Sequence, residues 1–343
     1  MQAMVLERLC DLEKETRPLK AVTLPDPQPG EGDIVIAVST CGVCHTELDE
    51  IEGRTPPAFF PMVLGHQAVG RVVGRGANAT RFNNGDRVGV AWIFSACGNC
   101  EFCCSGRENL CPEFKATGRD AHGGYAEYMR VPEKFAFAIP SGMADAEAAP
   151  LLCAGAIGYR SLRLTGIEDG QHLGLTGFGA SAHLVLKMMQ HRYVRSRIYV
   201  FARSARERAF ALELGAVWAG EIGDKPPALL DAVIDTTPVW KPVLEALKCL
   251  KPGGRLVINA IRKESRDNDL LMGLDYPAQL WMEKEIKSVA NVARGDVSAF
   301  LKIAADIPIK PEYQAYALDE ANTALLELKQ RKIRGAKVLR IGA

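Results

Sequence analysis

Residues 171–182 read Gln-His-Leu-Gly-Leu-Thr-Gly-Phe-Gly-Ala-Ser-Ala. The apolar run Gln171–Thr176 is a strand candidate, and a Gly-x-Gly-x-x-Ala turn follows it and opens a helical stretch. Glycines at such a place allow a tight turn and let a pyrophosphate approach the N-terminus of the helix. We therefore predict a strand–turn–helix unit that binds a dinucleotide cofactor, with contacts from Gly177, Gly179, Ala180 and Ala182.

The same alternation of strand and helix continues between about residues 151 and 290. The strand candidates are Gln171–Thr176, Arg197–Phe201, Ala232–Asp235 and Arg255–Asn259. The helix candidates between them are Ala182–Gln190, Arg206–Leu214 and Val239–Leu250. This alternation predicts a parallel sheet that is covered on both faces.

The parts of the chain on either side of this region have a different sequence pattern. The first 150 or so residues are rich in short β-branched runs, such as Ile34–Val38 and Val69–Val73, separated by Gly/Pro/Asn turns. After about residue 291 the pattern changes again. It predicts a helix, a strand, a long helix and a final strand at Val297–Ala305, Pro308–Tyr316, Asp319–Gln330 and Ala336–Ile341.

Composition limits the class of protein. The chain has 343 residues, enough for about two domains, and a net charge of +1, which gives no electrostatic reason to expect nucleic acid or an anionic membrane as partner. No apolar run reaches the roughly 20 residues that cross a bilayer, and the start of the chain carries acids instead of a signal-peptide core. We expect a cytoplasmic protein with no membrane and no nucleic acid partner.

Ten cysteines stand out, because clustered thiols in a reducing compartment are typical of metal ligands. Five of them lie within the fifteen residues 97–111. Two C-x-x-C steps followed by a fourth cysteine predict a closed, structural zinc site. Its ligands would be Cys97, Cys100, Cys103 and Cys111. Cys104 is not needed by this spacing, although an exchange of register with Cys103 stays open.

A second candidate metal set is dispersed along the chain. Cys44 precedes His45 and Thr46, His66 follows a glycine, and Cys153 follows an apolar run. Each residue is a weak signal, since a lone histidine near a glycine is commonly an ordinary loop residue. Taken together, Cys44, His66 and Cys153 form a Cys/His/Cys set that can hold a catalytic zinc with one open position.

Several motifs together identify a family. They are C-G-V-C-H-T-E-L from residue 41, G-H-Q at 65–67, the four-cysteine loop, G-G-Y-A-E-Y at 123–128, the glycine turn and R-G-A-K-V-L at 334–339. The chain resembles, over essentially its whole length, the zinc-dependent medium-chain dehydrogenases, specifically the alcohol dehydrogenase branch. The resemblance implies an α/β fold in which a GroES-like β-rich catalytic domain, residues 1–152 and 291–343, carries an inserted Rossmann domain. The inserted domain is a doubly wound parallel sheet of residues 153–290.

The resemblance also implies an activity, the transfer of a hydride between a nicotinamide cofactor and an alcohol or carbonyl compound. Cys44, His66 and Cys153 would hold the catalytic zinc, and the four-cysteine loop a second zinc. Thr46 would start the proton relay, and Glu47 would orient the ligand histidine.

Further roles follow from the same resemblance. His45 and Arg294 fall where the family places cations near the cofactor pyrophosphate. Trp92 and Phe94 fall on a segment that lines the substrate pocket, although ordinary core packing explains these two aromatic residues equally well. The resemblance also leads us to expect a homodimer or a homotetramer.

Three departures from the family pattern matter. Gln67 replaces a glutamate beside the zinc ligand, and Asp49 replaces a histidine at the outer end of the proton relay. The second nucleotide-binding strand ends in Ala202-Arg203-Ser204 with no acid for a ribose 2′-hydroxyl, and an arginine suits a 2′-phosphate. We expect NADP(H) to be favoured over NAD(H), unless Arg203 simply belongs to the solvated face of the next helix.

Other functions stay open at this point. A polyol or aryl-alcohol dehydrogenase is the nearest alternative to a general alcohol dehydrogenase or aldehyde reductase. A non-enzymatic zinc-thiol redox sensor with the same fold is a distant alternative. A zinc-free quinone-reductase-like enzyme would lack the Cys/His/Cys set, so metal analysis distinguishes it.

Overall fold

The computed structural model describes residues 1–307, 309–330, 332 and 335–342. Pro308, where the predicted strand Pro308–Tyr316 begins, and Arg334 of the closing motif lie outside these ranges. The chain divides into two compact units, one of Met1–Cys153 with Val292–Ala343 and one of Ala154–Asn291. None of the helices in the described ranges is long and apolar enough to span a bilayer.

The first unit is built around a seven-stranded sheet with the order β10-β6-β5-β3-β18-β17, in which β9 also pairs with β3. Smaller sheets are formed by β2-β1-β4 and by β7-β8. Its strands are β1 (Gln2–Leu6), β2 (Leu19–Thr23), β3 (Asp33–Val43), β4 (Met62–Val63), β5 (Ala68–Arg75), β6 (Arg87–Val90), β7 (Ile93–Ser95), β8 (Lys115–Ala116), β9 (Tyr128–Pro132), β10 (Ala136–Ala138), β17 (Tyr313–Ala317) and β18 (Ala336–Arg340).

Helices in this unit are short, apart from those of the returning segment. They are α1 (His45–Ile51), α2 (Glu101–Cys104), η1 (Glu108–Leu110), η2 (Glu133–Phe135), α3 (Asp145–Pro150), α9 (Arg294–Asp306), η5 (Leu318–Glu320) and α10 (Ala321–Lys329). A π-helical turn, η3 (Leu151–Gly155), follows α3 and carries Cys153.

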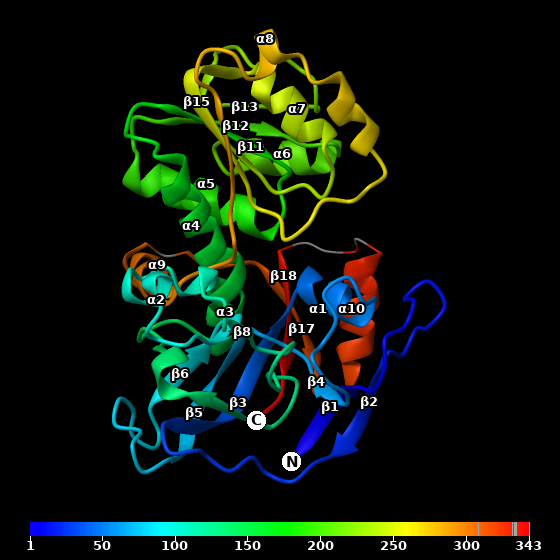
Figure 1. Cartoon of the computed structure of the whole chain (residues 1–343), viewed down its shortest axis with the longest axis vertical. Coiled ribbons are helices and arrows are strands. Elements are labelled where there is room, and N and C mark those ends of the chain that lie inside the picture. The colour runs from blue at the N-terminus through cyan, green and yellow to red at the C-terminus, as the bar shows by residue number, and fades with distance from the viewer. Residues whose placement is uncertain (308, 331, 333–334, 343) are drawn as a thin grey trace. The chain divides into compact units, whose positions relative to one another are not determined.

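Strand β3 is the centre of the first unit and positions its site. Ile34, Ile36 and Val38 are buried in it, and its last residue, Val43, directly precedes Cys44. The strand pairs antiparallel with β5, β9 and β18. Strand β18, red in Figure 1, comes from the end of the chain and lies beside the blue β3. The returning segment therefore completes the sheet that fixes the start of α1.

The second unit is a six-stranded sheet in the order β13-β12-β11-β14-β15-β16, and every strand pair is parallel. The order reverses at β11, so the point between β11 and β14 is a topological switch point, where doubly wound sheets bind ligands. Its strands are β11 (His172–Thr176), β12 (Arg197–Phe201), β13 (Trp218–Gly220), β14 (Leu230–Asp235), β15 (Leu250–Ile258) and β16 (Glu285–Ser288). Its helices are α4 (Ala156–Thr165), α5 (Ala180–Arg192), α6 (Ala205–Glu213), α7 (Lys241–Lys248), η4 (Asn268–Gly273) and α8 (Tyr276–Gln279).

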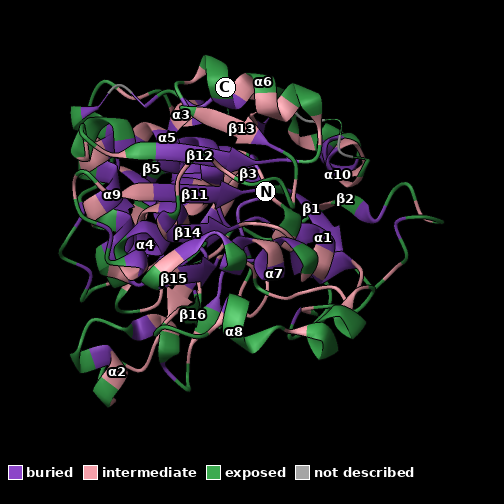
Figure 2. Ribbon diagram, turned by 90° about the horizontal axis from the view of Figure 1, so that it is seen from above, coloured by how far each residue is buried: buried purple, intermediate pink, exposed green. Residues whose placement is uncertain are grey.

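The central strands of this sheet are buried, as expected for a sheet with helices on both faces. Figure 2 shows β12, β11 and β14 largely in the purple of buried residues. The four predicted strands match β11, β12, β14 and β15, and the predicted sheet is confirmed. Two edge strands, β13 and β16, were not predicted, because β13 has only three residues and β16 has no apolar pattern. The predicted helix Val239–Leu250 is too long, since Leu250 begins β15 and Pro252 cannot continue a helix.

Candidate metal centres and cofactor loop

A short helix and one buried carboxylate organise the dispersed Cys/His/Cys set. Cys44 is the residue before α1, and Glu47 lies in the first turn of that helix. One Glu47 oxygen accepts from the backbone N–H of Cys44 (2.7 Å), and the other contacts His66 Nδ1 (2.6 Å). Glu47 and His66 are fully buried. The carboxylate thus fixes the histidine ring with Nε2 as the nitrogen that is left for another contact.

That nitrogen has no partner among the described residues, although it is buried. The side-chain ligand atoms of Cys44, His66 and Cys153 all lie within 4.8 Å of one another. A hydrogen bond with Cys153 lowers the pKa of Cys44, although burial opposes the shift. Zinc prefers thiolate and imidazole ligands. This set offers two thiol groups, one of which has a lowered pKa, and one imidazole nitrogen without a described partner. The residues present therefore fit a zinc ion with one coordination position open.

The neighbouring residues of α1 surround this set in different ways. The Thr46 hydroxyl lies 3.7 Å from Cys44 Sγ, and the His45 side chain is exposed. Asp49 forms an ion pair with Arg54, which also contacts Glu52. The hydroxyl of Thr46 is thus beside the cluster, whereas the Asp49 carboxylate is engaged with a guanidinium.

Glu50 is a second buried acid on this helix, three residues after Glu47, and no sequence motif marks it. It is fully buried, and neither carboxyl oxygen has a hydrogen-bond partner among the described residues. Burial raises its pKa well above the usual value, and the charge of Glu47 adds to this effect. The charges of His66 and Arg119 oppose it. A buried, unpaired carboxylate is costly, so this side chain opposes folding when it is ionised.

We expect Glu50→Gln to stabilise the protein after zinc has been removed by a chelator. Because the folded-state pKa of Glu50 is raised, wild-type stability is highest below the unfolded value and falls as pH rises toward the folded value. The advantage of the variant should therefore grow from about pH 4.3 upward by about 1.4 kcal/mol per pH unit, until the raised pKa is reached. Urea unfolding of both zinc-free proteins at pH 5 and pH 7 measures the difference.

Glu52 gives a matched control. Hydrogen bonds from Lys329 and Arg54 lower its pKa, although partial burial opposes the shift. Glu52→Gln should therefore destabilise the protein, and more at pH 7 than in acid. An equal loss of stability in both variants would contradict the role assigned to burial at Glu50.

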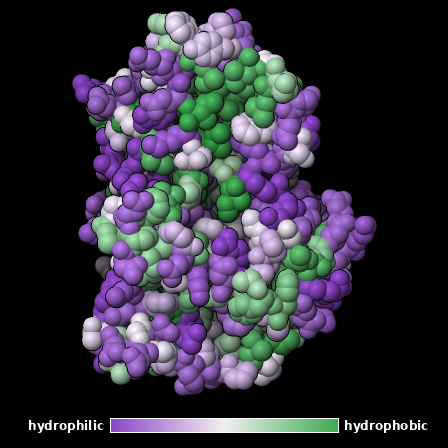
Figure 3. All heavy atoms as spheres, viewed as in Figure 1, coloured by the Kyte–Doolittle hydropathy of each residue, from purple (hydrophilic) through white to green (hydrophobic). Residues whose placement is uncertain are grey.

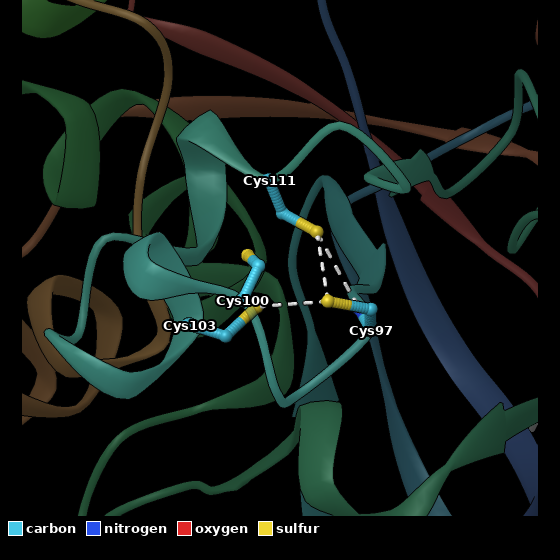
Figure 4. Close-up of side chains that lie close together, drawn as sticks. All are labelled: Cys97, Cys100, Cys103 and Cys111. Atoms are coloured by element: carbon cyan, nitrogen blue, oxygen red, sulfur yellow. Dashed lines mark hydrogen bonds between the residues drawn. The ribbon is translucent and has the colours of Figure 1, made fainter.

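The four-cysteine loop forms a second cluster of thiols. Figure 4 shows the side chains of Cys97, Cys100, Cys103 and Cys111 converging, and their sulfur atoms lie within 4.8 Å of one another. Hydrogen bonds from the backbone at Asn99 and Cys100 lower the pKa of Cys97 to about 7. Four close thiols, one stabilised as a thiolate, fit a closed tetrahedral zinc site. Cys104 is exposed and its thiol contacts the Asn99 carbonyl at 3.6 Å, so Cys103, not Cys104, belongs to this cluster.

Arg294, at the start of α9, contacts this loop. Its guanidinium donates to Glu108 Oε1, with Nε at 2.8 Å and a terminal nitrogen at 2.7 Å. It also lies over the ring of Phe135, 5.0 Å from the centroid. The other Glu108 oxygen is buried without a partner among the described residues. Arg294 is thus held by the four-cysteine loop.

The two aromatic residues that the sequence singled out differ in burial. Trp92 is buried, packs on Phe114 with ring centroids 5.1 Å apart, and lies beneath the guanidinium of Arg119 at 5.2 Å. Its indole N–H is buried with no hydrogen-bond partner in the described part of the chain. Phe94 lies in β7 and is half-buried.

The glycine turn in the second unit has the predicted strand–turn–helix setting between β11 and α5. Gly177 has a φ of +78°, and a Cβ there would lie 2.7 Å from Thr236 Oγ1. At Gly179, which precedes the first turn of α5, a Cβ would meet nothing within 4 Å. Ala180 begins the helix, and Ala182 is fully buried. Open space at the N-terminus of a helix fits the pyrophosphate of a dinucleotide.

The residues that follow β12 are arranged around the N-terminus of α6. The Ser204 hydroxyl caps this helix by accepting from the backbone N–H of Glu207 at 3.1 Å. Arg208 donates to the carbonyl groups of Ala202 and Arg203, both at 2.9 Å. Arg203 is exposed, and its guanidinium forms no hydrogen bond or ion pair with any described residue. This cation is therefore free to meet a ligand beyond the end of β12.

Comparison with known proteins assigns the chain to a family. The model of the alcohol dehydrogenase GroES-like domain matches residues 30–141. The probable alcohol dehydrogenase AdhA of Mycobacterium tuberculosis is 43% identical over 332 residues, which cover 95% of this chain and 94% of the relative. The chain belongs to the zinc-dependent medium-chain alcohol dehydrogenases.

Other members of the alcohol dehydrogenase family agree with this assignment. An alcohol dehydrogenase of Geobacillus stearothermophilus is 30% identical across 92% of this chain and 93% of its own length. The solved structure of a cinnamyl alcohol dehydrogenase from Sorghum bicolor superposes with a TM-score of 0.83 at 27% identity, covering 99% of this chain and 97% of that one. The predicted family and fold, a GroES-like domain with a Rossmann-type parallel sheet, are confirmed, and this alcohol dehydrogenase is an oxidoreductase.

Proposed function

We propose that this chain is a zinc-dependent alcohol dehydrogenase or aldehyde reductase that transfers a hydride between NADP(H) and a primary or secondary alcohol or the matching carbonyl compound. The observation that carries the proposal is the cluster of Cys44, His66 and Cys153, in which the buried His66 Nε2 has no hydrogen-bond partner among the described residues. Zinc, when bound there, supplies a Lewis acid that lowers the pKa of an alcohol, and the nicotinamide accepts or donates the hydride.

The side chains around the cluster have separate tasks in this proposal. Glu47 holds His66 in the tautomer and orientation that a metal ligand needs. Thr46 Oγ1, beside Cys44 Sγ, accepts the hydrogen bond of the substrate hydroxyl and passes its proton outward. Asp49 is paired with Arg54, so it is not an essential base.

A second zinc ion per subunit is proposed for the four-cysteine loop. Because four sulfur ligands leave no open position, its role would be structural. The segment from Cys97 to Cys111 has little secondary structure besides α2 and η1, so a metal would supply the cross-links that its small core cannot.

The two units take different parts in the proposal. We assign residues 1–152 and 291–343 to the catalytic domain and residues 153–290 to cofactor binding. The pyrophosphate would meet Gly177, Gly179, Ala180 and Ala182 of the glycine turn. His45 and Arg294 are proposed as further cations for it, and Arg294 is held for this purpose by Glu108. Ser204 and Arg203 would receive the 2′-phosphate of NADP(H) at the end of β12.

We expect kcat/KM to be higher with NADPH than with NADH, and Ala202→Asp combined with Arg203→Ala to reverse the preference. The expected shift is roughly tenfold or more, since a hydrogen bond to a charged group contributes about 1.5–3 kcal/mol. Arg195→Ala, in the loop before β12, is the control and should leave the ratio unchanged. A wild-type enzyme that is faster with NADH would overturn the assignment of Arg203.

Aryl alcohols are a second candidate substrate class. A probable cinnamyl alcohol dehydrogenase of Oryza sativa is 33% identical across 89% of this chain. Trp92, which packs on Phe114, is two residues before the half-buried Phe94. We propose that Trp92 and Phe94 help to line the substrate pocket. A panel of aliphatic, polyol and aryl alcohols with their aldehydes, each run with NADPH and NADH, tests the function. Failure of every pair with zinc-loaded protein would refute it.

The outer edge of the second unit's sheet bears on the oligomeric state. Among the described strands β16 pairs with β15 alone, and all four of its residues are exposed. Met272, Trp281 and Met282 are exposed nearby in sequence. Figure 3 shows green hydrophobic atoms gathered in the upper part of the face in view. We propose that a second copy of the chain covers this edge in a homodimer or homotetramer, and light scattering can measure the oligomeric state.

The proposed metal-binding thiols suit a reducing compartment, so we propose that the protein is located in the cytoplasm.

A further inference from the structure

A buried ion pair lies at the carboxyl edge of the second unit's sheet, where the strand order reverses. Asp235 is the last residue of β14 and is fully buried. Its Oδ1 accepts from Thr176 Oγ1 (2.5 Å), from Thr237 Oγ1 (2.7 Å) and from the Thr237 backbone N–H (3.3 Å). Its Oδ2 accepts from Lys263 Nζ. The carboxylate is therefore satisfied by donors from three segments.

Lys263 belongs to the segment that follows β15, and its side chain is 8% exposed. Besides Asp235, its ammonium group donates to the carbonyl groups of Thr237 (2.7 Å) and Val239 (3.1 Å). All three ammonium protons are thus used, which is what a buried cation requires. The pair joins the loop after β14 to the loop after β15.

Two neighbouring contacts join the same two loops. The backbone N–H of Glu264 donates to the Pro238 carbonyl at 2.6 Å. Asp267 Oδ2 accepts from the backbone N–H groups of Trp240 and Lys241, each at 2.9 Å. Because Lys263 is the residue that reaches the strand end itself, we take the Asp235–Lys263 pair as the centre of this connection.

The connected loops pack against the glycine turn. Thr176 pairs in register with Asp235 and directly precedes Gly177. Thr236 Oγ1 donates to the Thr176 carbonyl at 2.9 Å, and a Cβ on Gly177 would lie 2.7 Å from that hydroxyl. The positions of Thr236 and Thr237 therefore determine how much space is left around Gly177. These positions depend in turn on the contacts that Asp235 and Lys263 make with Thr237.

We infer that Asp235 and Lys263 are positioning residues for the dinucleotide. They hold Thr236 and Thr237, which border Gly177 at the switch point, in the geometry that binds the cofactor. The inference rests on the proposed function, because it assumes that the cofactor binds at the glycine turn. Neither side chain needs to touch the cofactor. Small misplacements remote from a ligand can still be costly when they move the groups that orient it.

The same two strands offer a matched control at their amino ends. Lys251 and Asp231, at the beginnings of β15 and β14, form a Lys–Asp pair with both N–O distances at 2.8 Å. The pairing chemistry is the same, but this pair is more exposed, with 41% for Lys251 and 17% for Asp231, and it lies at the sheet edge opposite the glycine turn. Lys251→Met with Asp231→Asn should therefore leave cofactor binding within about twofold of wild type.

The test uses the zinc-loaded full chain with Lys263→Met and Asp235→Asn combined, because removing both charges leaves no unpaired buried ion. We expect the Kd of NADPH to rise by roughly tenfold or more, while kcat at saturating NADPH falls by less than about threefold. Each single variant should weaken NADPH binding no less than the double variant, since the two residues act as a unit. Lys263→Arg, which keeps the charge, should restore part of the affinity.

Three results would overturn the inference. The first is a Kd of NADPH that is the same in the double variant as in the amino-end control variant. The second is a double variant in which only kcat falls, and the third is one in which the Tm falls while the Kd of NADPH is unchanged. Wild-type protein that binds neither NADPH nor NADH would instead refute the proposed function, so the two failures are distinguishable.

Discussion

Cys153→Ala is expected to abolish alcohol oxidation while leaving the protein folded. Cys153 is one of the three side chains whose ligand atoms lie within 4.8 Å of one another, and alanine suits the helical turn that carries it. A catalytic metal contributes several kcal/mol to the reaction, so its loss should lower kcat on the order of a thousandfold or more. Metal analysis should fall from two zinc ions per subunit to one, with little change in Tm.

Cys100→Ala should have the opposite profile. Loss of one ligand of the four-cysteine cluster should chiefly lower the Tm and the zinc content, because that cluster cross-links a loop with little core. Cys104→Ala is the matched control, since this neighbouring thiol is exposed and outside the cluster, and it should change neither quantity. Active wild-type protein with one zinc ion or none would refute the two-site proposal.

Thr46→Val is expected to lower kcat by about 10²–10⁴-fold, the usual cost of lost proton-transfer assistance. Valine keeps the shape of threonine but cannot accept or pass a proton, whereas Thr46→Ser keeps the hydroxyl and should retain most activity. Asp49→Asn should cost much less, because the Asp49 carboxylate is held by Arg54. The measurement is kcat against pH at saturating substrate and cofactor.

A loss in Asp49→Asn as large as that in Thr46→Val, with zinc content and cofactor binding intact, would make Asp49 an essential base. It would also show that the ion pair with Arg54 opens during the reaction. The open-ended relay would then be wrong.

The parts of the fold that the sequence predicted are those specified by local patterns. The strand, glycine turn and helix around Gly177 are contiguous, and the spacing of the four cysteines is a property of one loop. Strand β16 was missed because its four residues, Glu285–Ser288, are all exposed and carry no apolar pattern. Its strand character comes from pairing with β15, which is a tertiary contact.

The same distinction applies to the candidate site. Glu47 and Thr46 were predicted because they adjoin a metal-ligand motif. Glu50 was not, since an acid on a helix is normally at the surface and only the fold reveals its burial. The partner of Arg294 was equally hidden, because Glu108 is 186 residues away along the chain. Lys263 and Asp235 are 28 residues apart and meet only when two strands lie side by side.

The return of the chain to its first unit has a consequence for the order of folding during synthesis. Residues 154–291 are contiguous, so this unit can fold as soon as it leaves the ribosome. The other unit cannot, because β18, the neighbour of β3, is translated only after the whole of residues 154–291. Since β3 leads directly into Cys44, the Cys/His/Cys set reaches its final geometry only after β18 has emerged. Newly made chains should therefore complete the parallel sheet of the second unit before Cys44, His66 and Cys153 can assemble.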